Sequence, residues 1–308
     1  MRKYKLVPKQ ALHAVTASRL QSRIVINGFM RSGTTWLQQV VRDALQAQTI
    51  FEPLSPATHE MQRIADPEAA DANHHMFMPL SMASLEAYET RALDRAFKGI
   101  GNNGYAYILT PNFADAFSTQ LVVKIVRGGF ILSGIADRFG APILHIRRHP
   151  ASVLASFQNT DWTWSLSDVR LSDVYPASSA KSEDEAELIS ILHQFDTDSD
   201  RRFAALWALS ERAAQTAVEN GEADLILYEN HVGRPDSIIA LLSSQGFDIQ
   251  NRAPEDTISP VTVAGRTELT RQQRMSDWKQ RLQPQQIATL KSILSELFPP
   301  ALDDDWSV

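Results

Sequence analysis

The chain has 308 residues, of which 44% are apolar and 21% charged, with no cysteine. This composition is typical of a globular protein and excludes extended disorder, collagen-like repeats and long coiled coils. The absence of cysteine excludes disulfides, thiolate zinc sites, iron–sulfur clusters and a cysteine nucleophile. A net charge of −6 argues against a broad nucleic-acid-binding surface. No apolar run approaches the roughly 20 residues that a membrane-spanning helix needs.

The first 22 residues mix Lys3, Lys5, Lys9 and Arg19 with short apolar patches. They lack the continuous apolar stretch of a secretory signal, so we expect a cytoplasmic protein.

Short β-branched runs alternate with helical patterns along the chain. Buried strands are predicted at 23–27, 120–126, 142–147 and 224–228, with 105–109 a weaker candidate. Apolar residues at helical spacing predict helices over 35–46, 201–218 and 284–297. This alternation predicts an α/β fold with a central parallel sheet flanked by helices.

No linker divides the chain, so we expect a single domain, 1–308, with a core of about residues 23–297. Residues 158–200 are polar and contain Trp162, Trp164 and a charged tract at 181–187. This stretch is too long for a plain connection, which predicts a partly ordered insertion that shapes a substrate mouth or a lid.

The first predicted strand runs directly into GFMRSGTTW, residues 28–36, and a helix follows. The spacing is that of a P-loop, G-x-x-x-x-G-[KT]-[ST], with Thr34 in place of the usual lysine. Glycines let successive backbone N–H groups face an anion, and the helix N-terminus adds its positive dipole end. The order of strand, loop and helix therefore predicts an anion-binding site that includes Ser32, Gly33, Thr34 and Thr35.

The missing lysine argues against a metal-dependent triphosphate site, because P-loop kinases use that lysine together with Mg²⁺. Arg31 supplies a fixed positive fork instead. None of the predicted strands ends in the aspartate that would hold a metal ion. We therefore expect a phosphate-bearing ligand and no metal.

Residues 31–36, RSGTTW, resemble the motif with which sulfotransferases bind the 5′-phosphosulfate of 3′-phosphoadenosine 5′-phosphosulfate (PAPS). The resemblance extends from residue 23 to about residue 297. It implies a P-loop-like sulfotransferase domain with PAPS as donor.

A second anchor follows the predicted strand at 142–147. Arg148 precedes a proline-started helix, and Ser156 lies eight residues further on. Without the resemblance, a pair of basic residues such as Arg147 and Arg148 before a proline-started helix is more often a solvated strand end. The family pattern implies that Arg148 and Ser156 bind the 3′-phosphate of PAPS.

A third segment, RQQRMSDWK at 271–279, resembles the family's R-K-G-x-x-G-D-W-K stretch, with Gln272, Gln273 and Ser276 replacing Lys and two glycines. The resemblance implies a contact between Arg271 and the 3′-phosphate. Tyr228, in LILYE, resembles the family's Y-E-D beside the adenine, although an ordinary strand-end tyrosine fits equally well. Trp36 can stack on the adenine or belong to the core.

Sulfuryl transfer needs cations aimed at the oxygen that gains charge, and a base for the acceptor proton. Arg31 suits electrostatic stabilisation. Lys124 matches the lysine of the family's K-T-H motif, but Val126 stands where that motif has histidine.

The base is therefore sought elsewhere. FEPL, residues 51–54, resembles the F-E-P-L of carbohydrate sulfotransferases, and this points to Glu52. His59, His74 and His75 are rivals, each also read as an ordinary exposed histidine.

The expected function is transfer of a sulfuryl group from PAPS to a hydroxyl or amine of a small-molecule or carbohydrate acceptor. A P-loop kinase of small metabolites and a catalytically silent nucleotide-binding module are the alternatives. The sequence does not fix the oligomeric state.

Overall fold

The computed structural model describes residues 15–56, 76–102, 104–107, 114–158, 166, 169–251, 271–303 and 306. Their core is one sheet of five strands, all parallel to their neighbours, in the order β2-β3-β1-β4-β5. The strands are β1 (Ser22–Asn27), β2 (Gln48–Phe51), β3 (Gln120–Ile125), β4 (Ile143–Arg147) and β5 (Asp224–Leu227). The predicted α/β fold with a central parallel sheet is confirmed.

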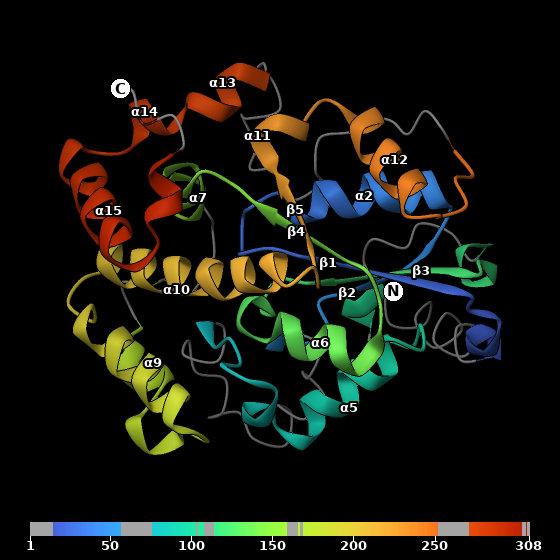
Figure 1. The fold of residues 1–308 in the computed structure, drawn as a ribbon, viewed down its shortest axis with the longest axis horizontal. Helices are drawn as coiled ribbons and strands as arrows, with labels where there is room; N and C mark the ends of the chain where they lie inside the picture. Colours follow the sequence, from blue (N-terminus) through green and yellow to red (C-terminus); the bar gives the residue numbers. More distant parts are fainter. Residues whose placement is uncertain are drawn as a thin grey trace, which may run out of the picture.

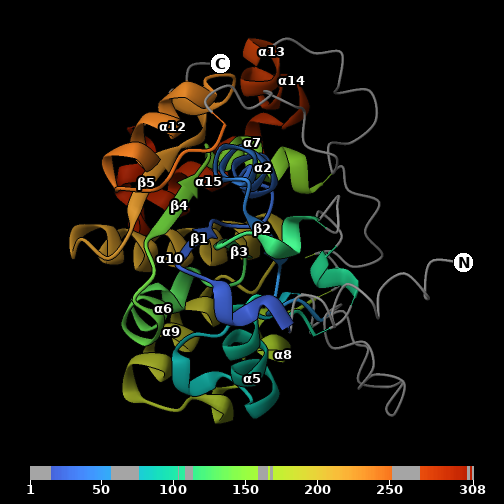
Figure 2. The same ribbon diagram turned by 90° about the vertical axis from the view of Figure 1, so that its right-hand side faces the viewer.

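Helices cover both faces of the sheet (Figure 1). Helices α2 and α12 pack on one face, and α5, α6 and α10 pack on the other; Figure 2 shows the same layers from the side. The α-helices of the described residues are α2 (Thr34–Leu45), α5 (Ala87–Ala96), α6 (Leu132–Phe139), α7 (Pro150–Phe157), α8 (Leu171–Val174), α9 (Glu183–Gln194), α10 (Ser199–Glu219), α11 (Tyr228–His231), α12 (Pro235–Ser244), α13 (Arg271–Ser276), α14 (Trp278–Arg281) and α15 (Pro284–Leu297).

The strand order places the functional edge of the sheet. From β1 the chain passes to β2 and β3 on one side, and then crosses to β4 and β5 on the other. In open parallel sheets, ligands bind at the carboxyl ends of the strands where this direction reverses. Here that point lies at the carboxyl ends of β1, β3 and β4.

Helix α2 follows from its sequence. Leu37, Val40, Val41 and Ala44 form a fully buried face against β1, β3 and α12, and burial of each large aliphatic side chain stabilises the fold by about 1.5–3 kcal/mol. The helix ends at Leu45, and the next residue, Gln46, has a left-handed backbone, φ 50°, and donates its N–H to the Arg42 carbonyl oxygen in the last turn.

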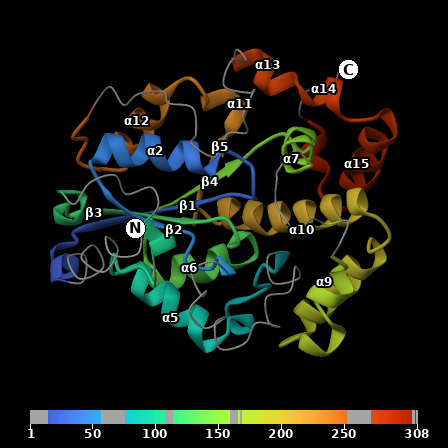
Figure 3. The same ribbon diagram turned by 180° about the vertical axis from the view of Figure 1, so that it is seen from behind.

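The C-terminal helices gather beside α7. Helices α13, α14 and α15 lie at the same end of the molecule as α7 in both Figure 1 and Figure 3. Helix α15 packs along α10, and its apolar side chains share one core with those of α7 and α10. Segments that are more than 100 residues apart in the sequence are thereby joined.

One strand prediction is wrong, and one strand was not predicted. Residues 105–107 are not a strand but part of a 3-10 helix, Gly104–Tyr107, in which the hydroxyl of Tyr107 accepts a hydrogen bond from the Gly101 N–H. Residues 108 and 109 lie outside the described part. A strand that the pattern did not predict, β2, pairs with β3 at the sheet edge.

The described part of 158–200 is helical. Helices α8 and α9 bury Leu171, Val174, Ile189 and Leu192 against the core of α7 and α10. The N-cap hydroxyl of Ser182 accepts a hydrogen bond from the Glu185 N–H, which starts α9. Trp162 and Trp164, expected at a substrate mouth, lie outside the described residues.

Candidate active site

The loop between β1 and α2 is held close to β4 and Tyr228 by two glycines. A Cβ atom at Gly28 would lie 2.4 Å from the Ile146 carbonyl oxygen, and one at Gly33 would lie 2.5 Å from the Tyr228 ring. Gly33 also has a left-handed backbone, φ 96°. Only glycine accommodates both the close approach of the Tyr228 ring and the left-handed backbone at position 33.

The loop presents donors that no side chain satisfies. The Ser32 hydroxyl is fully buried and has no hydrogen-bond partner among the described residues. Helix α2 starts at Thr34, and the preceding N-cap residue, Gly33, has no side chain to cap its first N–H groups. Such a helix start, with a buried hydroxyl beside it, suits a bound anion.

The second predicted anchor lies directly against this loop. The Arg31 Nε donates to the Ser156 Oγ at 3.2 Å, and the Arg148 Nη1 donates to the Arg31 carbonyl oxygen at 3.3 Å. Arg31 has a left-handed backbone, φ 70°, which is a strained conformation for a residue with a side chain. The structure therefore brings Arg31, Arg148 and Ser156 together, although they come from two different strand–helix connections.

An aromatic side chain supports Arg148. Its guanidinium lies 4.7 Å from the centre of the Tyr228 ring, and the Trp36 ring meets Tyr228 edge-on with centroids 6.0 Å apart. Glu229, the next residue, accepts a hydrogen bond from the His149 N–H at 3.1 Å. Burial raises the pKa of Glu229, and the nearby Arg148 charge opposes that shift.

Glu52 reaches the same edge because β2 runs parallel to β3. Phe51 pairs with Lys124, and the Lys124 Nζ lies 3.0 Å from a Glu52 carboxylate oxygen and 2.9 Å from the Thr35 Oγ1. Glu52 has a left-handed backbone, φ 51°. Burial lowers the pKa of Lys124, while the Glu52 carboxylate acts in the opposite direction. The expected base and the expected lysine thus form one buried ion pair beside α2.

Arg127 is a candidate that the sequence analysis missed. The residue is only 6% exposed, and its Nη1 lies 3.9 Å from the second Glu52 carboxylate oxygen. That oxygen also accepts the Val126 N–H at 3.3 Å, at the position where the K-T-H motif has histidine. Burial and the Glu52 charge raise the pKa of the nearby Tyr105 to about 12. Arg127 directly follows a predicted strand, which was the available signal.

The third predicted segment docks on α7. The His149 ring stacks on Trp278, with centroids 4.8 Å apart and an angle of 13°, and the Ser152 Oγ donates to the Met275 carbonyl oxygen at 3.3 Å. The Arg281 guanidinium donates to the Ala155 carbonyl oxygen. Arg271 opens α13, but its side chain lies outside the described residues, as do His59, His74 and His75.

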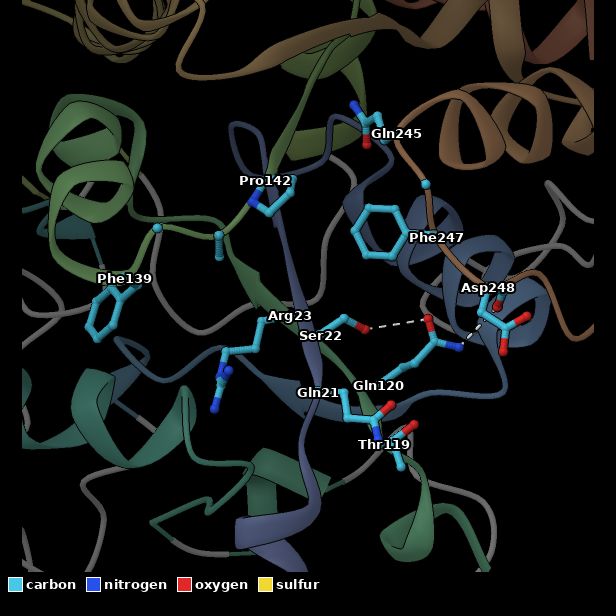
Figure 4. Close-up of a pocket in the computed structure, with 13 residues that line it drawn as sticks. Gln21, Ser22, Arg23, Thr119, Gln120, Phe139, Pro142, Gln245, Phe247 and Asp248 are labelled. Atoms are coloured by element: carbon cyan, nitrogen blue, oxygen red, sulfur yellow. Dashed lines mark hydrogen bonds between the residues drawn. The ribbon is translucent and has the colours of Figure 1, made fainter.

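A separate hollow of about 450 Å³ lies at the opposite, amino edge of the sheet (Figure 4). It is lined by the starts of β1 and β3 and by the segment after α12, with Gln120, Pro142 and Phe247 among the lining residues. None of the predicted site residues lines it.

Two further properties concern only the part of the chain that the structure describes. It contains no group of three or more histidine or acidic side chains arranged to hold a metal ion. None of its helices combines the length and the apolar character needed to cross a membrane.

No family model matches the chain. A protein from Archaeoglobus fulgidus, described as uncharacterized, is 27% identical over 144 residues, which is 42% of this chain and 46% of that protein. The chain therefore spans about half the length of this relative.

Several solved sulfotransferase structures are similar to the chain along most of its length. The sulfotransferase domain of the Synechococcus PCC 7002 olefin synthase gives a TM-score of 0.49 at 14% identity, covering 94% of this chain and 96% of that domain. Sulfotransferase STF1 from Mycobacterium tuberculosis H37Rv gives 0.44 at 14% identity, covering 88% and 80%. Mouse sulfotransferase SULT7A1, solved with PAP, gives 0.44 at 14% identity, covering 93% and 88%.

Proposed function

We propose that this chain is a sulfotransferase that transfers a sulfuryl group from PAPS to a hydroxyl or amine of a small-molecule or carbohydrate acceptor. The observation that carries the proposal is the direct link between two anion anchors. Arg31, in the phosphate loop, is hydrogen-bonded to Ser156, and Arg148 is hydrogen-bonded to Arg31. Two anchors so close together suit one small ligand with two separate phosphate groups.

The residues present fit such a donor. The buried Ser32 hydroxyl and the uncapped start of α2 offer donors for a phosphosulfate, and Arg148 and Ser156 offer donors for a 3′-phosphate. The Trp36 and Tyr228 rings border this region and offer faces and edges for an adenine. Arg271 is assigned to the 3′-phosphate as part of this proposal.

The donor would supply the sulfuryl group and leave as adenosine 3′,5′-bisphosphate. Arg31 and Lys124 provide positive charge near the loop, where negative charge grows as the bond between sulfur and the bridging oxygen breaks. Glu52 accepts the proton of the acceptor hydroxyl as the new oxygen–sulfur bond forms. The Lys124 and Arg127 cations on either side of Glu52 fix the orientation of its carboxylate.

Calorimetry with adenosine 3′,5′-bisphosphate and with ATP, each with and without Mg²⁺, tests the donor site. We expect metal-independent binding of the bisphosphate and much weaker binding when the 3′-phosphate is absent. Tighter binding of ATP with Mg²⁺ would support a small-metabolite kinase instead.

Arg148→Ala should weaken the bisphosphate far more than an analogue that lacks the 3′-phosphate. Arg147→Ala is the matched control, because the neighbouring Arg147 side chain donates to Gln215 on α10 and lies over Phe298. Equal losses for both ligands in Arg148→Ala would remove Arg148 from the 3′-phosphate site.

Turnover separates an enzyme from a silent nucleotide-binding module. Incubation with PAPS and a panel of hydroxyl and amine acceptors should give products heavier by one SO₃ group in mass spectrometry. Glu52→Gln should reduce this turnover and leave bisphosphate binding intact. Unchanged turnover in Glu52→Gln would return the role of base to the histidines.

A further inference from the structure

Three polar side chains form a buried chain at the carboxyl end of the central strands. The His145 Nδ1 lies 2.7 Å from the Asn27 Oδ1, and its Nε2 lies 2.9 Å from a Glu211 carboxylate oxygen. The Asn27 Nδ2 donates to the Ile125 carbonyl oxygen at 2.7 Å. All three residues are at most 1% exposed, so every one of these bonds is shielded from water.

The donors and acceptors fix most of the hydrogen positions. The Ile125 carbonyl only accepts, so the Asn27 amide nitrogen faces it and the amide oxygen faces His145. The His145 Nδ1 must then carry a hydrogen. The remaining proton lies between the Nε2 and Glu211, and on either atom the pair has no net charge. These three side chains together therefore carry no net charge, and the second Glu211 carboxylate oxygen is buried without a hydrogen-bond partner among the described residues.

The position of this chain ties it to the proposed donor site. Asn27 is the last residue of β1, immediately before Gly28, and it pairs in register with both Ile125 and His145. Each of these strands then supplies a site residue: β1 leads into the phosphate loop, β3 carries Lys124, and β4 leads to Arg148.

Helix α10 holds the outer end of the chain firmly. Glu211 is on this helix, and its neighbour Ser210 leaves no room for a Cβ at Gly129, whose position would be 2.1 Å from the Ser210 Oγ. The side chains of Asn27 and His145 therefore join α10 to the ends of β1 and β3 and to the middle of β4. Apolar residues would fill the same space, but they could not donate a hydrogen bond to the Ile125 carbonyl oxygen or fix the positions of the strands through directional bonds.

We infer that Asn27, His145 and Glu211 are positioning residues for the phosphate loop, and that their hydrogen bonds rather than a net charge perform this role. The inference rests on the proposed function for its ligand. The network acts through the backbone of residues 28–33 and touches no reacting atom.

Three variants test whether the network positions the phosphate loop and whether it does so through hydrogen bonds rather than a net charge. Asn27→Leu removes the bonds to Ile125 and His145 while keeping the side-chain size, and Asn27→Ser is a milder form in case the first does not fold. Glu211→Gln removes the carboxylate, but its amide can still donate to the His145 Nε2. Asp196→Asn is the matched control. Asp196 forms a buried ion pair, with an N–O distance of 2.7 Å, with Arg202 on α10, the helix that also carries Glu211. Asp196 also accepts a hydrogen bond from α8 and does not contact the central strands through these bonds.

Binding and kinetics are then compared with stability. We expect the Asn27 variants to weaken adenosine 3′,5′-bisphosphate at least tenfold in calorimetry and to raise the KM for PAPS, with the acceptor KM unchanged. Glu211→Gln should bind within threefold of wild type. Asp196→Asn should lower the urea midpoint and leave bisphosphate affinity unchanged.

Two results would overturn the inference. Folded Asn27 variants that bind the bisphosphate within twofold of wild type would reduce the network to a structural role. A Glu211→Gln variant as impaired as Asn27→Leu would show that the charge is required. If wild type binds no bisphosphate, the proposed function fails, but hydrogen–deuterium exchange still tests the network. Asn27→Ser should then speed exchange of the backbone amides of residues 28–33 at least tenfold, whereas Asp196→Asn should not. Equal exchange rates of these amides in Asn27→Ser and wild type would refute the inference.

Discussion

Replacing Gly33 by alanine tests whether the phosphate loop is packed as the structure shows. The new Cβ would lie 2.5 and 2.6 Å from two carbons of the Tyr228 ring. That ring is held between Trp36 and the Arg148 guanidinium. Overpacking of this kind costs about 1–3 kcal/mol, and the left-handed backbone adds about 1–2 kcal/mol for a residue with a Cβ. Gly33→Ala should therefore lower the free energy of unfolding by about 2–5 kcal/mol.

Gly221→Ala separates the two contributions. Gly221 has a similar left-handed backbone, φ 74°, but apart from its chain neighbours no atom of the described residues lies within 4 Å of the position of its Cβ. This variant should lose only the backbone contribution of about 1–2 kcal/mol. Urea unfolding of both variants measures the difference, and bisphosphate calorimetry of Gly33→Ala should show weaker binding.

A double variant adds a further check. In a Tyr228→Ala background the overlap disappears, so Gly33→Ala should cost no more there than Gly221→Ala does in the wild type. If Gly33→Ala and Gly221→Ala lose the same free energy in the wild-type background, the close contact between the loop and Tyr228 is refuted.

Other predictions follow from the buried charges and rings. Lys124→Met leaves the Glu52 carboxylate without its closest cation and should lower the free energy of unfolding, measured in urea, by about 3–5 kcal/mol. Adding Glu52→Gln should recover more than half of this loss. No recovery in the double variant would refute the pairing. Tyr228→Leu should weaken the binding free energy of the bisphosphate by about 0.5–2 kcal/mol, because the contact between the ring and the Arg148 guanidinium is lost. Tyr228→Phe keeps the ring and should bind the bisphosphate as wild type does. Weaker binding by Tyr228→Phe would implicate the hydroxyl instead. Burial raises the pKa of Glu89 above 4.5, so its contribution to stability is complete below pH 4.5 and is lost as the pH rises through the folded-state value. Glu89→Gln should therefore gain stability relative to wild type between pH 4 and pH 7, and a constant difference in urea unfolding would contradict this.

The sequence predicted the sheet well where strands are buried on both faces. The runs at β1, β3 and β4 are apolar and β-branched because both sides meet helices. Strand β2 escaped prediction because it has only four residues, two of them polar, at the edge of the sheet. Residues 105–107 were mistaken for a strand because their apolar and aromatic side chains serve another purpose: they belong to a short helix in which Tyr107 is buried and the half-buried Tyr105 packs on Phe51.

The candidate site was predictable where a short motif carries it. Residues 31–36 and the spacing of Arg148 and Ser156 are local features, and the structure places these groups together. The ion pair of Glu52 with Lys124 and the approach of Arg127 depend on the pairing of β2 with β3. Pairing of that kind joins residues about 70 positions apart and cannot be read from local spacing.

The left-handed backbones of Arg31 and Glu52 have a consequence for protein engineering. Conformations of this kind cost about 1–3 kcal/mol each and persist only when the surrounding structure enforces them. A screen for heat-resistant variants would therefore favour glycine or asparagine at both positions. Each such change would discard the guanidinium or the carboxylate that the proposed reaction uses. Libraries selected for durability alone should keep these two codons fixed.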